Sequence, residues 1–171
     1  MKAFKIIMWL CVAITAASIF AFSAQPAAQS DSVSKGITKK VVDIMPSTKH
    51  KSENEKKEIV KKINNVIRKC AHYTIFLCLG AFLAGAVYLS FGKKNTALNL
   101  FFVCCAACLI YAISDEVHQI FVPGRGPGVK DVLIDFCGAL TGMGITSFIR
   151  FIYLSVKKRR LKTIENKLTD I

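Results

Sequence analysis

The chain has 171 residues, 53% of them hydrophobic, and a formal net charge of +13 at pH 7. One small soluble core of this length cannot bury so much apolar surface, so a water-soluble globular class is disfavoured. The basic residues lie mainly between and after long apolar runs, which is typical of membrane proteins, and we therefore expect no nucleic-acid partner.

Four apolar runs dominate the chain, at about residues 4–24, 71–91, 97–113 and 132–156. A helix needs about 20 residues to cross a bilayer, and no run contains an internal proline. We therefore predict an all-α integral membrane protein with four transmembrane helices in a small bundle, plus one amphipathic surface helix. The first span, in the segment 1–24, has the basic start of a secretory signal but a longer apolar stretch, so we expect an uncleaved helix or signal anchor.

Residues 25–52 read as a polar connector, and its prolines and glycine lead us to expect weak order there. Ser52 followed by Glu55 is a capping-box pattern, which predicts that a helix begins at this point. Residues 53–70 then form the amphipathic helix, with isoleucines and valine on one face and lysines on the other. We expect this helix to lie on the membrane surface, although packing of its apolar face on the bundle stays open.

The helical core is predicted to cover residues 71–156, and a basic tail follows at 157–171. The tail opens with four consecutive lysines and arginines, and other lysines precede the first run or lie in the short loop at 92–96. The positive-inside rule therefore places both termini and this loop in the cytoplasm, for a multi-pass protein of a bacterial cytoplasmic membrane. The lysine-rich connector counts against this orientation.

Polar residues collect where the apolar runs end or begin. Because four spans alternate in direction, the ends of the first and third and the starts of the second and fourth share one membrane face. Pairs spaced four apart project from one side of each helix; they are Arg68 with His72, Asp115 with Gln119, and Asp131 with Asp135. Asp135 lies inside a span and must face the bundle, because an ionisable group among lipid tails costs several kcal/mol. With the predicted topology, this polar face is extracytoplasmic.

Small residues at a spacing of four predict where two spans approach closely. Gly138 and Gly142 give one such pair in the fourth span, and Ala81 and Gly85 give another in the second. Small side chains let helix backbones approach in a membrane, so we expect a tight contact between these two spans.

Four separated blocks of the sequence resemble the VanZ-like membrane proteins. They are residues 22–25, 68–73, 115–125 and 130–138, and the block from Asp115 to Arg125 is the most specific. The resemblance implies a small bacterial inner-membrane protein of the cell envelope. The family is named for a member linked to low-level resistance to the glycopeptide teicoplanin, and the resemblance implies no settled reaction.

The polar face of the predicted bundle holds the candidate functional residues. Imidazole, carboxylate and amide groups can transfer or orient protons, so the candidate catalytic residues are His72, Asp115, Glu116 and Gln119. Cations bind phosphate, and acids complete the polar surroundings, so the candidate ligand-binding residues are Arg68, Lys69, Arg125, Lys130, Asp131 and Asp135. The glycines around Arg125 would let backbone N–H groups approach such a ligand.

These residues lead us to expect recognition or modification of an anionic lipid-linked envelope molecule, such as a cell-wall precursor, with an effect on glycopeptide susceptibility. Membrane lipids are the other expected partners, and the residues leave open whether the protein is an enzyme. One alternative is a scaffold whose polar network only staples helices together, because buried ions in membranes normally pair. A small transporter is another, although no second polar cluster lies at the opposite ends of the runs.

No cofactor and no metal ligand is predicted. A divalent metal stays open as an alternative, because His72, His118 and the nearby acids would suit Mg²⁺, Mn²⁺ or Zn²⁺, but no HExxH-type spacing is present. The sequence also lacks a P-loop and a Rossmann glycine pattern, which excludes soluble nucleotide enzymes of those types. It does not indicate the oligomeric state.

Overall fold

The computed structural model of the chain describes residues 2–44, 52–92, 95–126 and 128–169. These residues form five helices and no strand: α1 (Lys2–Ser23), α2 (Ala27–Ile44), α3 (Glu53–Phe91), α4 (Ala97–Gln119) and α5 (Val129–Thr169). By length and composition, α1, α3, α4 and α5 can each cross a membrane. The predicted all-α bundle with four spans is therefore confirmed.

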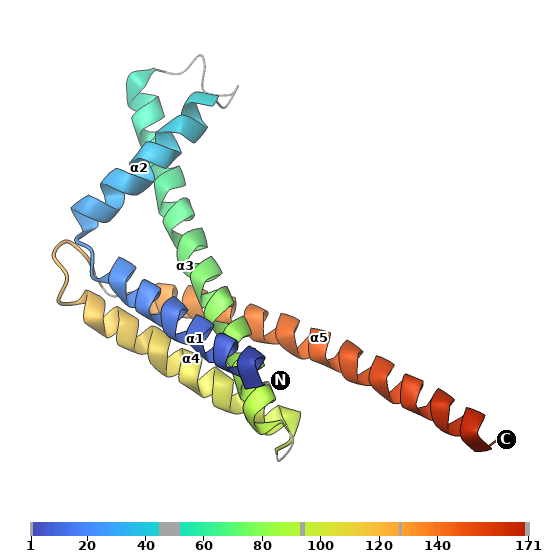
Figure 1. Cartoon of the computed structure of the whole chain (residues 1–171). Helices are drawn as coiled ribbons and strands as arrows, with labels where there is room; N and C mark the ends of the chain where they lie inside the picture. Colours follow the sequence, from blue (N-terminus) through green and yellow to red (C-terminus); the bar gives the residue numbers. More distant parts are fainter. Residues whose placement is uncertain (1, 45–51, 93–94, 127, 170–171) are drawn as a thin grey trace.

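Helix α3 is the centre of the bundle, and its second half runs between α1 and α4 on one side and α5 on the other (Figure 1). The core that these helices share is apolar. Phe76 of α3, Cys104 of α4 and Met143 of α5 are almost completely buried in it, and Ile19 of α1 joins them. Burial of these side chains fixes where the ends of the four spanning helices lie.

Helices α3 and α5 approach so closely that only glycine fits where they cross. A Cβ atom on Gly138 would collide with the carbonyl oxygen of Tyr73, and one on Gly142 would collide with the α3 backbone one turn further along. The predicted tight contact between the second and fourth spans is confirmed by these positions. Gly85 has a different neighbour from the one expected, because it faces the side chain of Met8 in α1.

Helix α3 continues well beyond the length that a membrane needs. It has 39 residues, which corresponds to about 58 Å at 1.5 Å per residue. It begins at the predicted capping box, in which the Ser52 hydroxyl accepts from the Glu55 backbone and the Glu55 carboxylate accepts from the Ser52 backbone. The amphipathic segment at 53–70 packs against α2 and continues directly into the second span, so it is not a separate helix.

The connector is where the structure corrects the sequence prediction. Residues expected to be weakly ordered form α2, although Gly36 lies within it. Thr38 and Val42 are buried, and the Thr38 hydroxyl donates to the amide oxygen of Asn64 in α3 at 3.3 Å. Packing on α3 therefore outweighs the low helix preference of this polar segment. The predicted breaker Pro46 lies outside the described residues.

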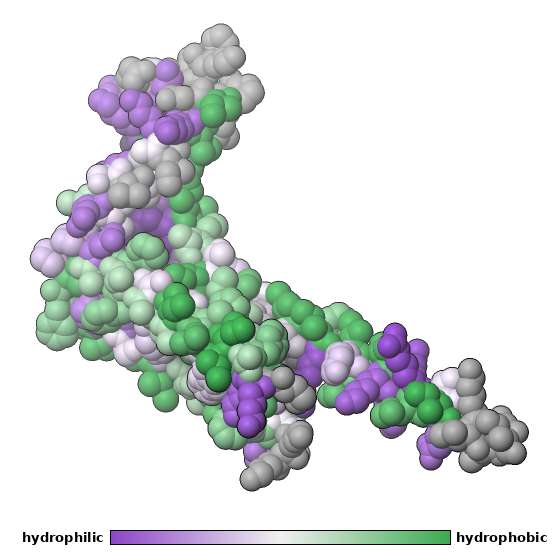
Figure 2. All heavy atoms as spheres, in the orientation of Figure 1, coloured by the Kyte–Doolittle hydropathy of each residue, from purple (hydrophilic) through white to green (hydrophobic). Residues whose placement is uncertain are grey.

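The surface has an apolar belt and two hydrophilic ends (Figure 2). Apolar side chains cover the middle of the molecule, and large ones such as Ile14 in α1, Phe102 in α4 and Phe148 in α5 are exposed. Hydrophilic side chains are concentrated on α2 and the first part of α3, although apolar ones such as Ile44 and Val66 are also exposed there. We call these two segments the arm (residues 27–44 and 53–70). The belt is the surface that suits lipid, and the arm lies outside it.

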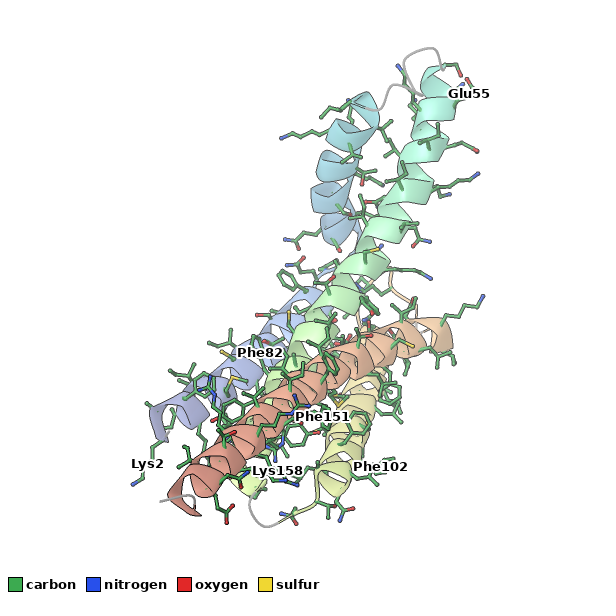
Figure 3. The ribbon with its side chains drawn as sticks, turned by 90° about the vertical axis from the view of Figure 1, so that its right-hand side faces the viewer. Lys2, Glu55, Phe82, Phe102, Phe151 and Lys158 are labelled. Atoms are coloured by element: carbon green, nitrogen blue, oxygen red, sulfur yellow. The ribbon has the colours of Figure 1, made fainter. Side chains whose placement is uncertain are left out.

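The arm and the far end of the bundle lie at opposite ends of the molecule (Figure 3). Glu55 is at the tip of the arm, whereas Lys2, Phe102 and Lys158 lie toward the other end. Helix α5 continues to Thr169, so the basic tail is a helical extension of the fourth span. Helices α1 and α4 end, and α5 begins, on the side of the arm (Figure 1).

Candidate functional site

Three helix ends meet beside α3 at the base of the arm, and buried polar side chains join them. Ser23, the last residue of α1, donates through Oγ to Oδ2 of Asp115 in α4 at 2.8 Å. Gln119 Nε2 donates to the same oxygen at 3.0 Å, and all three side chains are buried. The Asp115 carboxylate is therefore held in one orientation between α1 and α4.

His72 of α3 faces Asp135 of α5. Their Nδ1 and Oδ1 atoms are 3.7 Å apart, which is longer than an N–H···O hydrogen bond. Asp135 is 1% exposed, and in the described part of the chain neither of its oxygens has a hydrogen-bond partner. One ligand atom each from His72, Asp115 and Asp135 lies within 4.8 Å of the other two. We call these three residues the carboxylate–histidine cluster.

Arg125 anchors the loop between α4 and α5. Its Nε donates to the Gln25 carbonyl at 3.1 Å and its Nη2 to the Phe22 carbonyl at 3.0 Å. Gly124 before it has a φ of 75°, a conformation that other residues rarely adopt. Burial, and secondly the charge of Arg68, lowers the pKa of Arg125, but a guanidinium stays charged in proteins and has further N–H groups for a ligand.

Glu116 holds the other end of the same loop. Its Oε2 accepts a hydrogen bond from the Gly128 backbone N–H at 2.9 Å, and its side chain is buried. This bond ties the residues that precede α5 to the last turns of α4. Glu116 therefore has a structural contact in addition to any chemistry it performs.

A pocket of about 110 Å³ opens among these residues at the base of the arm. A volume of this order admits several water molecules or a group the size of a phosphate. Its lining combines cations, acids, a histidine and amides: Asn65, Arg68, Lys69, His72, Glu116, Gln119, Arg125, Asp131, Ile134 and Asp135. Such a lining can bind an anion and place it beside groups that exchange protons.

The family model for VanZ/LLP1 matches residues 6–150, which contain all of the pocket residues. The chain belongs to the VanZ/LLP1 family. No curated protein and no solved structure matches it. The family assignment confirms the resemblance carried by the four sequence blocks. With the four spanning helices, it makes the chain a multi-pass membrane protein of the VanZ type.

The structure brings most of the predicted residues of this VanZ/LLP1 protein together. All of them line the pocket except two, and one of these, Asp115, is bonded to Gln119 in the pocket wall. The other is Lys130, which is exposed and does not line it, whereas its neighbour Asp131 pairs with Lys69 at 3.5 Å. Their catalytic and ligand-binding roles stay predictions.

His118 does not join His72, as the metal alternative required. Its ring packs against Phe20 of α1, with the ring centroids 4.5 Å apart, and it does not line the pocket. It lies on the side of α4 that faces α1, whereas Glu116 and Gln119 of the same helix reach the pocket. A metal set that combines the two histidines is therefore not supported.

Two polar residues that belong to this VanZ/LLP1 site or contact it were not predicted. Asp31 of α2 pairs with Arg68 at 3.0 Å, and Asn65 lines the pocket. No sequence pattern indicates Asp31, because its segment has the composition of a weakly ordered connector. Asn65 does have a signal in the sequence, since it precedes Arg68 by three residues and His72 by seven, which is the spacing of one helix face.

Proposed function

We propose that this VanZ/LLP1 protein recognises the anionic, phosphate-bearing headgroup of a lipid-linked molecule of the cell envelope. The observation that carries the proposal is the pocket at the base of the arm, where Arg68, Lys69 and Arg125 line one small cavity. Guanidinium groups bind phosphate oxygens through paired hydrogen bonds. A ligand whose hydrocarbon tail lies beside the apolar belt would place its headgroup at the base of the arm, where the pocket lies.

The proton-exchanging groups of the pocket suggest how a bound ligand would be modified. His72 would act as proton donor or acceptor, and Glu116 would act as the second group, since both line the same cavity. Replacing either residue would then lower turnover and leave ligand affinity nearly unchanged. A protein that only binds its ligand would show no turnover to lose.

The proposal extends to the location of the pocket and to its effect on the cell. With both termini in the cytoplasm of a bacterial membrane, as the positive-inside rule favours, the pocket opens on the outer face. Lipid-linked cell-wall precursors are used at that face, and glycopeptides act there. We therefore propose that ligand binding by this protein alters susceptibility to teicoplanin-type glycopeptides.

Replacing Arg68 and Lys69 together with glutamine is expected to weaken binding of a polyprenyl monophosphate at least tenfold. The reason is that one charged hydrogen bond contributes about 1.5 kcal/mol or more, which is about tenfold in affinity. Titration of the detergent-purified full chain, followed by native mass spectrometry, measures this change. The control is Lys157→Gln with Lys158→Gln, which removes the same charge at the other end of the molecule. Equal affinity of the two double variants would contradict the proposal.

A helix-stapling scaffold is the second candidate, because several polar groups of the site bind one another. Asp115 holds the end of α1, and Arg125 and Glu116 hold the loop before α5. The same double variant separates the two functions. Arg68 and Lys69 are only partly buried, and ion pairs of this kind contribute about 0–1 kcal/mol. A scaffold would therefore keep its stability in the variant and show no phosphate binding in the wild type.

A further inference from the structure

The carboxylate–histidine cluster has the spacing of ligands around a single cation. Two atoms bound to one metal ion, each about 2.1 Å from it, lie about 3 to 4 Å apart. His72 Nδ1 and Asp135 Oδ1 are 3.7 Å apart, and an oxygen of Asp115 completes a set within 4.8 Å. The distance is too long for a hydrogen bond and suits two ligands of a common ion.

The two carboxylates of this cluster have no basic partner other than His72. Asp115 is 4% exposed and Asp135 is 1% exposed. Among the residues that the structure describes, neither forms an ion pair with a lysine or arginine. Of the cations in the neighbouring pocket, Arg68 and Lys69 pair with other acids and Arg125 donates to backbone carbonyls. Two buried negative charges beside lipid are costly unless they are compensated, and one protonated imidazole compensates only one of them.

We infer that His72, Asp115 and Asp135 bind one divalent metal cation. An imidazole nitrogen and two carboxylates suit Mn²⁺, Zn²⁺ or Mg²⁺, and two carboxylates balance the charge of such an ion. The hydrogen bonds from Ser23 and Gln119 fix the orientation of Asp115, as outer hydrogen bonds do for metal ligands. The adjoining pocket, which His72 and Asp135 line, gives an ion access from water.

This inference differs from the metal alternative read from the sequence, because it includes one histidine and excludes His118. It does not depend on which molecule occupies the pocket.

Manganese binding to the full chain tests this inference. Protein purified in detergent and stripped with EDTA is titrated with Mn²⁺, and electron paramagnetic resonance measures the free ion. The wild type is expected to bind one Mn²⁺ per chain, and Asp135→Asn is expected to weaken binding at least 100-fold. Asp131→Asn is the matched control, since it removes an acid from the same helix and pocket but leaves the cluster intact.

Thermal unfolding provides a readout that does not depend on activity. A bound ion raises the unfolding midpoint of a folded protein by mass action, so Mn²⁺ should raise it for the wild type and Asp131→Asn only. His72→Gln serves as a second variant should Asp135→Asn not fold, and it is expected to lose the same effect. Absence of saturable binding of Mn²⁺ and of Zn²⁺ by the wild type, or equal binding by the Asp135 and Asp131 variants, overturns the inference.

A second and independent inference comes from the arm. A groove of about 1190 Å³, which we call the arm groove, runs between α2 and α3. Seven basic residues and two acidic residues line it: Lys35, Lys39, Lys56, Lys57, Lys61, Lys62 and Arg68, with Asp31 and Glu58. Arg68 and Asn65 line both this groove and the pocket, so the two adjoin each other.

We propose that the arm groove binds an extended, water-soluble polyanion with repeating phosphate groups. Its lysines come from both helices, and on α3 Lys57 and Lys61 repeat at about 6 Å along the axis. Lys57 precedes His72 by 15 residues, which is about 22 Å along α3. Attraction to anionic lipid headgroups decays within about 8 Å of a membrane. Lysines about 22 Å from the level of His72 would therefore gain little from headgroups at that level. The length and concavity of the groove favour an extended chain over a lipid surface.

Inorganic polyphosphate is a direct probe for the arm groove. Binding of a labelled chain to the full protein in neutral-lipid nanodiscs is measured by fluorescence anisotropy at several salt concentrations. Lys57→Glu with Lys61→Glu is expected to weaken binding at least tenfold and to reduce its salt dependence, because fewer counterions are released. Lys40→Glu with Lys162→Glu changes the net charge equally outside the groove and is expected to have a smaller effect.

Three outcomes would overturn the proposal for the arm groove. They are absence of polyphosphate binding by the wild type, equal loss in the two double variants, and a groove variant that loses only its affinity for phosphatidylglycerol vesicles. The last result would mean that the groove faces a lipid surface. None of these outcomes bears on manganese binding or on the pocket ligand.

Discussion

Gly142→Val is expected to lower the free energy of unfolding by about 3 kcal/mol, the upper end of the roughly 1–3 kcal/mol that overpacking typically costs, because backbone atoms must move here. A Cβ atom at this position would collide with the Leu77 carbonyl oxygen and lie 2.8 Å from the backbone nitrogen of Ala81. Backbone atoms cannot rotate away as a flexible side chain can. Helices α3 and α5 would therefore have to separate, and thermal unfolding of the detergent-purified protein measures the loss.

Gly144 offers a control two residues further along the same helix. A Cβ atom there would meet nothing within 4 Å. Gly144→Ala is therefore expected to keep or raise stability, since alanine favours a helix over glycine by about 0.5–1 kcal/mol. Equal stability of Gly142→Val and Gly144→Ala would show that α3 and α5 do not cross as the structure describes.

The features of the fold that could be predicted from the sequence are those that local sequence patterns determine. The spans are visible as apolar runs, and Ser52 with Glu55 marks the start of α3 by a spacing of three residues. Helix α2 could not be predicted in this way, because its order depends on distant contacts such as that of Thr38 with Asn64, 26 residues away. A polar segment with a glycine has no local signal for such packing.

At the candidate site, the sequence could predict which residue types lie at the polar face, but it could not predict most of their partners. Asp135, inside an apolar run, could only face the bundle, and alternation of the spans placed it near His72. Sequence patterns did not show that Arg125 would bind the carbonyls of Phe22 and Gln25, about one hundred residues earlier. They also could not distinguish Lys69, which lines the pocket, from exposed Lys130, because both are lysines beside a predicted span at the same face.

Asp115→Ala is expected to lower the free energy of unfolding by about 3 kcal/mol, even in EDTA-treated protein that holds no divalent cation. The carboxylate oxygen Oδ2 accepts from both Ser23 Oγ and Gln119 Nε2. Without it, two buried donors lose their acceptor, and each buried group left unsatisfied costs about 1–3 kcal/mol. The end of α1 would also lose its polar link to α4, so denaturation of α1 should begin at lower temperature, as hydrogen exchange at residues near Ser23 can measure.

Matched variants separate this hydrogen-bond effect from a general effect of charge. Asp115→Asn keeps an acceptor for Ser23 and should lose less stability than Asp115→Ala. Asp131→Ala removes an acid whose ion pair with Lys69 is partly exposed, and it should cost about 0–1 kcal/mol. In a double-mutant cycle, Ser23→Ala should have less effect in the Asp115→Ala background than in the wild type, because the two residues contact each other. Strict additivity would mean that the bond between α1 and α4 does not contribute to stability.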